Sequence, residues 1–279
     1  MITRAKRAIQ GGVVLILASL AVASCSRVEL AYENADWLGA WRIGDYLELT
    51  GDQRSRLRQG LSAYQAFHRE NRLPAINRYL DRVDALIATP APEAGAVDAL
   101  FVDGERLLRR NVRDIVPLAA ELLRELDEAQ RRALAERLAE SRDTYVERLL
   151  IDQRQRALER TRDWIGPLEQ PQRDILAECV AAMPDVSDEW RAWRRQTEAE
   201  LIDMLRRDAP QAEVEGFLHA WLLEDSARSR VLQDYRQTSR ALWRQCTHAL
   251  LATLTPGQRA HARDRLASYR HDLETVASR

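Results

Sequence analysis

Leu49-Thr50-Gly51-Asp52-Gln53-Arg54, followed by Leu57 and Leu61, is the first copy of a thirteen-residue motif that occurs four times in this chain. Each copy reads Leu, a polar residue, two variable positions, Gln-Arg, and then apolar residues at helical spacing. The later copies are Leu126-Asp127-Glu128-Ala129-Gln130-Arg131, Leu168-Glu169-Gln170-Pro171-Gln172-Arg173 and Leu254-Thr255-Pro256-Gly257-Gln258-Arg259. This pattern predicts a helix start at four points of the chain.

The polar residue of each motif is expected to cap the helix that follows. Thr50, Asp127 and Thr255 have side-chain oxygens that can accept a hydrogen bond from the exposed backbone N–H groups of the first turn. A glutamine three residues later can reach back to the N–H of the cap residue, which completes a capping box. Glu169 is a poorer cap, so we expect the third copy to be the weakest.

The rest of the chain predicts an all-α protein. Apolar residues recur at spacings of three and four, and no alternating strand pattern competes with them. Prolines interrupt this pattern at residues 74, 90, 92, 167, 184 and 210. The stretches 127–165 and 215–253 contain few breaks, so each is expected to form one unbroken helix. We expect residues 49–279 to form a single domain, an elongated antiparallel bundle of about six long helical segments plus a short N-terminal helix that contains tryptophan.

The first 24 residues have the form of a lipoprotein signal peptide. Arg4, Lys6 and Arg7 precede a short apolar run that ends in Val22-Ala23-Ser24-Cys25. Such a run is too short to cross a membrane comfortably. We expect cleavage before Cys25 and lipid on this cysteine, with residues 25–48 as the lipid-anchored segment. An ordinary cleaved signal and an uncleaved anchor remain the alternatives.

Lipidation would place the protein on a membrane, and the residue after the cysteine indicates which one. Ser26 is not aspartate, which by the enteric sorting rule implies the outer membrane, with the protein facing the periplasm. Several acyl chains anchor a protein almost permanently. Loss of the three basic residues of the signal would take the formal charge from −1 to −4. Charges of both signs are interspersed, which argues against nucleic acid as a partner.

Aromatic residues are concentrated between Leu30 and Tyr46. Trp37 and Trp41 are four residues apart, so they share one face of a helix. Two interpretations remain open at this point. The helix could pack its tryptophans into a groove of the main body, or it could present them as a binding surface for a partner or for the nearby membrane.

Two resemblances follow from these residues. Residues 31–38, from Ala31 to Leu38, together with Asp45-Tyr46-Leu47-Glu48-Leu49-Thr50 and Gln53-Arg54, resemble an uncharacterised family of proteobacterial lipoproteins. That likeness covers essentially the whole chain and implies no catalytic residues. The Leu-Thr-x-x-Gln starts at 49–53 and 254–258 are similar to the motif of the Spy/CpxP family of periplasmic chaperones and stress sensors.

The sequence contains no motif for catalysis, for a metal or for a cofactor. None of the five histidines lies in a His-Glu-x-x-His pattern, and there is no Gly-rich phosphate loop or Gly-x-Ser-x-Gly turn. Cys179 and Cys246 fall on apolar helical stripes. In an oxidising periplasm they could form a disulfide, and two buried free thiols are the alternative.

These features predict an interaction protein of the cell envelope. The leading hypothesis is a lipid-anchored, periplasm-facing protein that binds other proteins, with a chaperone or stress-sensing role as one version. The alternative is a structural or assembly factor with one defined partner, which it would contact through Trp37 and Trp41. An enzyme is the third class, and no residues can be assigned to it.

Overall fold

The computed structural model describes residues 27–146 and 153–278, and within these ranges every regular element is an α-helix. The all-α prediction is therefore confirmed. The helices are α2 (Arg27–Glu33), α3 (Ala35–Tyr46), α4 (Gly51–Asn71), α5 (Leu73–Ala88), α6 (Ala94–Arg124), α7 (Glu128–Val146), α8 (Gln153–Ile165), α9 (Gln170–Ala181), α10 (Ser187–Arg206), α11 (Gln211–Leu223), α12 (Arg230–Thr253) and α13 (Pro256–Ala277).

One proline lies at a helix boundary, and another lies inside a helix that continues past it. The chain turns between α4 and α5 at Arg72, two residues before Pro74, because proline lacks the N–H that a continuing helix would need. Pro117, in contrast, lies inside α6, which runs on through it to Arg124. The surrounding helices therefore hold α6 together where its sequence favours a kink.

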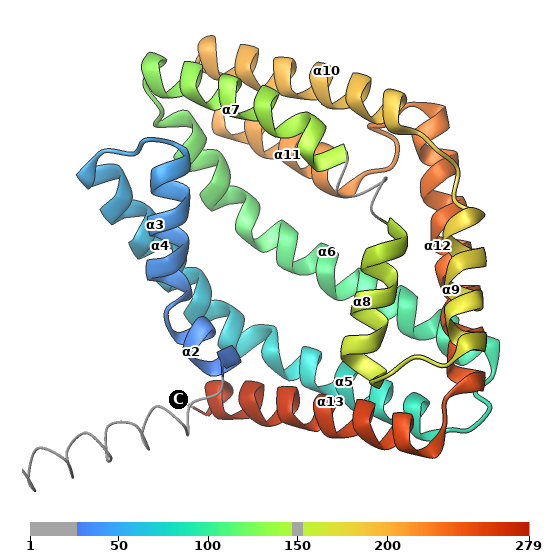
Figure 1. The fold of residues 1–279 in the computed structure, drawn as a ribbon. Helices are drawn as coiled ribbons and strands as arrows, with labels where there is room; N and C mark the ends of the chain where they lie inside the picture. Colours follow the sequence, from blue (N-terminus) through green and yellow to red (C-terminus); the bar gives the residue numbers. More distant parts are fainter. Residues whose placement is uncertain (1–26, 147–152, 279) are drawn as a thin grey trace, which may run out of the picture.

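The prediction of two long unbroken helices is wrong. α7 and α8 run in different directions, so residues 127–165 do not form one straight helix (Figure 1). The second stretch divides into α11 and α12 around residues 224–229. There the buried Arg228 donates hydrogen bonds to the carbonyls of Trp221 and Glu224, and Ser229 caps α12 by accepting from the N–H of Leu232. These contacts end one helix and start the next without proline or glycine.

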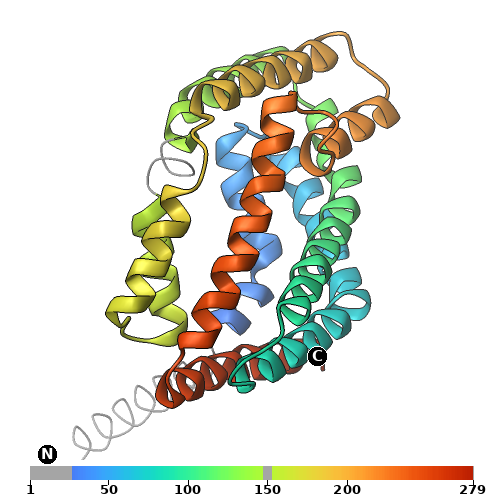
Figure 2. The ribbon, with the colours of Figure 1, turned by 90° about the vertical axis from the view of Figure 1, so that its right-hand side faces the viewer.

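The helices pack as antiparallel neighbours, and these neighbours are arranged around an open frame (Figure 1). α3 lies on α4, α5 on α13, α9 on α12, and α7 on α10. α6 crosses the frame and contacts α4, α5, α11 and α12. Figure 2 shows α12 and α6 side by side. The largest hydrophobic cluster lies where α3, α4, α7, α10 and the end of α6 meet; its buried members include Leu57, Leu126, Leu134 and Leu205.

The two described ranges have matching architectures. α3, α4 and α5 of the first range correspond in order to α8, α9 and α10 of the second, and α7 corresponds to α13. The last helix of each half packs on the third helix of the other half: α7 on α10, and α13 on α5. The frame is therefore pseudo-symmetric and closes by a mutual exchange of terminal helices.

Candidate functional site

The four predicted helix starts meet in two pairs, and their glutamines make the contact. Gln53 and Gln130 are both buried, and each donates its side-chain N–H to the side-chain oxygen of the other, at 3.1 and 2.8 Å. Each also caps its own helix by accepting from the N–H of Thr50 or Asp127, at 2.9 Å in both cases. Thr50 and Asp127 in turn accept from the glutamine backbone N–H, so both boxes are complete.

The second pair repeats this arrangement in the other half of the chain. Gln172 and Gln258 exchange side-chain hydrogen bonds of 2.7 and 2.9 Å. Gln258 accepts from the N–H of Thr255, whose hydroxyl accepts in return, and Gln172 accepts from the N–H of Glu169. We call each pair a glutamine clasp. The two clasps lie at opposite corners of the frame in Figure 1.

One further hydrogen bond follows the same rule in all four glutamines. Each donates its second side-chain N–H to the carbonyl that lies two residues before the partner's cap. The acceptors are the carbonyls of Glu125, Glu48, Thr253 and Pro167 for Gln53, Gln130, Gln172 and Gln258, at 2.8 to 3.2 Å. Every clasp amide thus uses both donors and both acceptor positions. The glutamines of the repeated motif therefore form a structural joint, and their amides have no donor or acceptor position left for a ligand.

In the second and fourth motifs, the arginine that follows the clasp glutamine fastens the exchanged helices. Arg259, on α13, donates to the carbonyls of Ile87 and Thr89 at the end of α5, at 2.7 and 2.8 Å. Arg131, on α7, donates to the carboxylate of Asp208 just past the end of α10, at 2.7 Å. In these two motifs the Gln-Arg pair therefore serves both the clasp and the helix exchange, whereas Arg54 pairs with Asp45 and Arg173 bonds to Gln170 and the carbonyl of Leu168.

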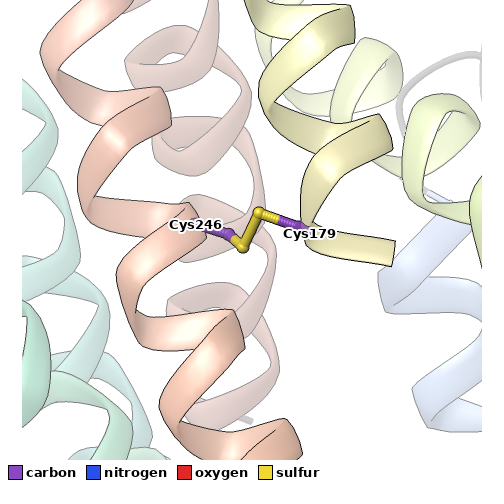
Figure 3. The surroundings of a disulfide bond; sticks show 2 residues. All are labelled: Cys179 and Cys246. Atoms are coloured by element: carbon purple, nitrogen blue, oxygen red, sulfur yellow. A yellow bond between two sulfur atoms is a disulfide. The ribbon is translucent and has the colours of Figure 1, made fainter. Parts of the chain in front are cut away.

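The predicted disulfide between Cys179 and Cys246 is present (Figure 3). It joins α9 to α12, with the two Cα atoms 6.2 Å apart. Cys179 lies ten residues after the cap residue Glu169, and Cys246 lies nine residues before the cap residue Thr255. Counting in the same way from the caps Thr50 and Asp127 gives Gly60 and Leu118 in the first half. There, too, the helices meet closely: the side chain of Leu118 fills the space that a Cβ at position 60 would need.

Trp37 and Trp41 lie on α3 at the edge of its contact with α4. Both side chains are 51% exposed, and their rings stack with centroids 6.4 Å apart. Ala40 and Gly44, which are buried where α3 packs on α4, lie on the adjoining face of α3, so the tryptophans border this contact. We call the exposed residues Trp37, Leu38 and Trp41 the aromatic surface. Because two large rings remain half exposed to water next to this packed contact, the aromatic surface is a candidate binding site.

A hollow of about 320 Å³ lies beside the tryptophans, between α3 and the start of α4. Arg54 and Arg58 line it; Arg54 pairs with Asp45 at 3.4 Å and Arg58 with Asp36 at 3.2 Å. Both pairs are solvent-exposed enough to contribute little to stability. The hollow therefore offers apolar rings beside two guanidinium groups that can change partners.

A second hollow, of about 460 Å³, lies among α5, α6, α11 and α12, and the sequence analysis did not detect it. Arg236, Arg240 and Arg244 line it from α12 at intervals of four residues, so they share one helix face. α6 contributes Arg109 and apolar side chains. We call this hollow the arginine groove. The four-residue arginine spacing is visible in the sequence, but the apolar side of the groove comes from distant segments.

Crowding of guanidinium groups affects the electrostatics beside this groove. Burial, together with the nearby charge of Arg236, lowers the pKa of Arg228 to about 10. Burial also lowers the pKa of Arg236, although the carboxylate of Asp225, 2.6 Å from its Nε, acts in the opposite direction. Arg228 is held by backbone carbonyls and packs over the ring of Trp193 at 4.9 Å. Its role is to shape the end of α11.

Cys25 and the signal peptide lie outside the described residues. Among the described residues, no group of three or more His, Cys, Asp or Glu side chains is placed to hold a metal ion. No helix in residues 27–146 or 153–278 combines the length and apolar character needed to cross a membrane.

Comparison with known proteins gives a family and no activity. Residues 45–236 match a family of unknown function (DUF6279), which covers more than half of the chain and three of the four clasp motifs. No curated protein and no solved structure matches the chain.

Proposed function

The chain belongs to the DUF6279 family, whose function is unknown, and from its geometry we propose a lipid-anchored envelope protein that acts by binding protein. In this proposal it sits on the periplasmic side of the outer membrane. The aromatic surface on α3 is its binding surface, and it needs neither a cofactor nor a metal for this role.

The observation that carries the proposal is the exposed tryptophan pair. Tryptophan is enriched among the residues that dominate protein–protein binding energy, because it buries a large area at little cost in side-chain entropy. Trp37 and Trp41 have nearly parallel rings, and the helix that carries them is fixed on α4 through the buried Ala40 and Gly44 beside them. The surface is thus rigid before binding, which reduces the entropy that a partner must overcome.

The shape of this surface favours one defined partner over many loosely bound clients. A chaperone that holds unfolded chains needs an extended apolar groove, whereas the aromatic surface is a compact patch beside a small hollow. Arg54 and Arg58 at the hollow complement an acidic group on the partner. We therefore favour the structural or assembly role over the Spy/CpxP-like role.

The position of the patch in the chain agrees with an anchored protein. Arg27, the first residue of α2, is two residues after Cys25, a distance of at most about 7 Å. If Cys25 carries lipid, α2 starts at the membrane surface and α3 follows it directly. The partner would then be a protein at the inner face of the outer membrane.

Site-specific photocrosslinking in cells tests this proposal. A photoreactive phenylalanine analogue at position 41 should give one discrete protein adduct, and the same analogue at position 164 should not. Trp164 is a suitable control because it is also exposed, at 40%, but lies on α8. We expect Trp37→Ala to remove the adduct at 41, since loss of a central interface tryptophan costs about 2 kcal/mol or more.

Two further outcomes separate the parts of the proposal. Cys25→Ser should abolish acyl labelling and reduce the adduct; unchanged acyl labelling would contradict the lipoprotein assignment. Adducts with lipid alone at position 41 would show that the aromatic surface rests on the membrane instead of on a protein.

A further inference from the structure

The arginine groove is distinct from the aromatic surface and has a different chemistry. α6 and α11 contribute apolar side chains, of which Leu108 is 63% and Leu222 50% exposed, and Phe101 lies beside them. α12 contributes Arg236, Arg240 and Arg244. The two sets of side chains line a single hollow of about 460 Å³, within the usual range of about 300–1,000 Å³ for small-molecule sites.

The ion pairs around the groove leave positive charge uncompensated. Arg109 and Arg240 both contact Glu105, and Arg228, Arg236 and Arg240 all contact Asp225. Within residues 27–146 and 153–278, Arg244 pairs only with Asp98, with 4.0 Å between its Nε and the nearest carboxylate oxygen. Five guanidinium groups thus face three carboxylates, so two positive charges remain.

Arg244 has the longest ion-pair distance of the arginines that line the groove from α12, so it is the one best placed to take a new anionic partner. Its Nε is buried and has no hydrogen-bond partner among the described residues. A buried N–H without an acceptor costs free energy, and an anion in the groove would supply the acceptor. An oxygen there would also reduce the repulsion among the arginines of α12, because a charge-assisted hydrogen bond to guanidinium is strong in a partly buried site.

We propose that the arginine groove binds an anionic amphiphile, a molecule with one hydrocarbon chain that ends in a carboxylate or a phosphate group. Its chain lies along Leu108, Leu222 and Phe101, and its anionic head is held by Arg244 and Arg240. A free fatty acid and a phospholipid share this chemistry. This site is independent of the proposed protein-binding role.

The dimensions of the groove favour an amphiphile over a protein partner. A stable protein interface usually buries about 800 Å² on each partner, and most of it is flat. The groove is a short hollow with exposed apolar side chains and adjoining cations, which matches a single chain with one charged end. Small-molecule sites have this composition: an apolar lining with a few polar groups that fix orientation.

Native mass spectrometry of the full chain in a neutral maltoside detergent tests the assignment. We expect dodecanoate and dodecyl phosphate, each below its micelle concentration, to bind one molecule per chain. Dodecyltrimethylammonium and inorganic phosphate should not bind at the same concentration, because one lacks the anion and the other the chain. Binding of dodecanoate alone would point to a fatty acid, and binding of dodecyl phosphate alone to a phospholipid.

Three substitutions decide whether the groove is the site. Arg244→Gln should weaken binding at least tenfold, and Leu108→Gln should weaken dodecanoate more than it weakens octanoate. Arg230→Gln is the matched control: it removes an arginine from the same helix, where it is exposed and paired with Asp234. Circular dichroism should show that each variant is folded.

The proposal is wrong if Arg244→Gln binds as tightly as the wild type while folded. It is also wrong if the cationic amphiphile binds equally well, since the groove would then be merely apolar. Binding of an acidic amphipathic peptide through Arg244, with no binding of either amphiphile, would assign the groove to a protein segment and overturn it.

Discussion

At the scale of single residues, the glutamine amide is the group best suited to the clasp. It carries two donors and two acceptor positions, and in Gln53 and Gln130 all of them are used within 3.1 Å. Glutamate at either position would bring a charge and lose both donors, and leucine would leave the neighbouring groups unpaired. The sequence predicts the caps, because a capping box is local. It does not predict the pairing, because Gln53 and Gln130 are far apart in the chain.

The clasp predicts strong coupling between its two members. Gln130→Leu should cost about 1–3 kcal/mol, because it leaves buried polar groups of Gln53, Asp127 and Glu48 without partners. The double variant Gln53→Leu/Gln130→Leu should cost less than the sum of the single variants, with a coupling energy of about 0.5–3 kcal/mol. Urea unfolding of the four proteins measures both quantities.

A substitution outside the clasp provides the comparison. Gln155 is exposed, and its side chain donates a hydrogen bond to Glu159 of its own helix, so Gln155→Leu should change stability little. Strictly additive effects of Gln53→Leu and Gln130→Leu would show that the two amides do not depend on each other.

At the scale of helices, the sequence predicts starts better than ends. The four boxes mark the starts of α4, α7, α9 and α13, and Pro74 marks the turn before α5. The break between α11 and α12 depends on Arg228, whose guanidinium binds carbonyls only once both helices are packed. The candidate sites divide in the same way. The tryptophan pair is visible at four-residue spacing, whereas the arginine groove combines residues from four helices.

The contact of α2 with α4 should weaken in mild acid. His68 on α4 lies between Tyr32 and Tyr64, with its Nδ1 3.0 Å from the hydroxyl of Tyr32. Burial, followed by the charge of Arg72, lowers the pKa of His68. Below about pH 6.5, His68 therefore binds a proton more readily in the unfolded chain than in the folded protein. The stability contributed by neutral His68 is present above that pH and is lost as the pH falls.

Unfolding measured at pH 7.5 and pH 5.5 tests this sign. The wild type should lose stability between the two values, and His68→Gln, which cannot titrate, should lose less. His271→Gln is the control, since His271 is exposed on α13. An equal loss in all three proteins would show that other groups cause the pH dependence.

At the scale of the whole molecule, the two halves bring an equivalent pair of helices together by different contacts. Cys179 and Cys246 are covalently joined between α9 and α12, whereas Gly60 and Leu118 only touch between α4 and α6. The glycine permits the close approach that a side chain would block. The two contacts occupy equivalent places. Each joins two helices beside a glutamine clasp, ten residues after one cap and nine residues before the other.

This equivalence predicts that a second disulfide can be introduced. In the variant Gly60→Cys/Leu118→Cys, the two sulfur atoms should pair under oxidising conditions. The closed loop of about 58 residues would add about 4 kcal/mol to stability in the chain-entropy model, less any strain. Mass spectrometry without reductant counts the free thiols, and unfolding with and without reductant gives the gain. Two free thiols after oxidation would contradict the pseudo-symmetry.

The exchange of α7 and α13 also has a consequence for how such a chain can arise. Each half covers its own third helix only in part: α5 also packs on the helix that ends the second half, and α10 on the helix that ends the first. A polypeptide of half this length would expose that surface alone, and would bury it by trading its last helix with a second copy of itself. The present chain has the form of such a swapped homodimer after duplication, with its two copies joined end to end.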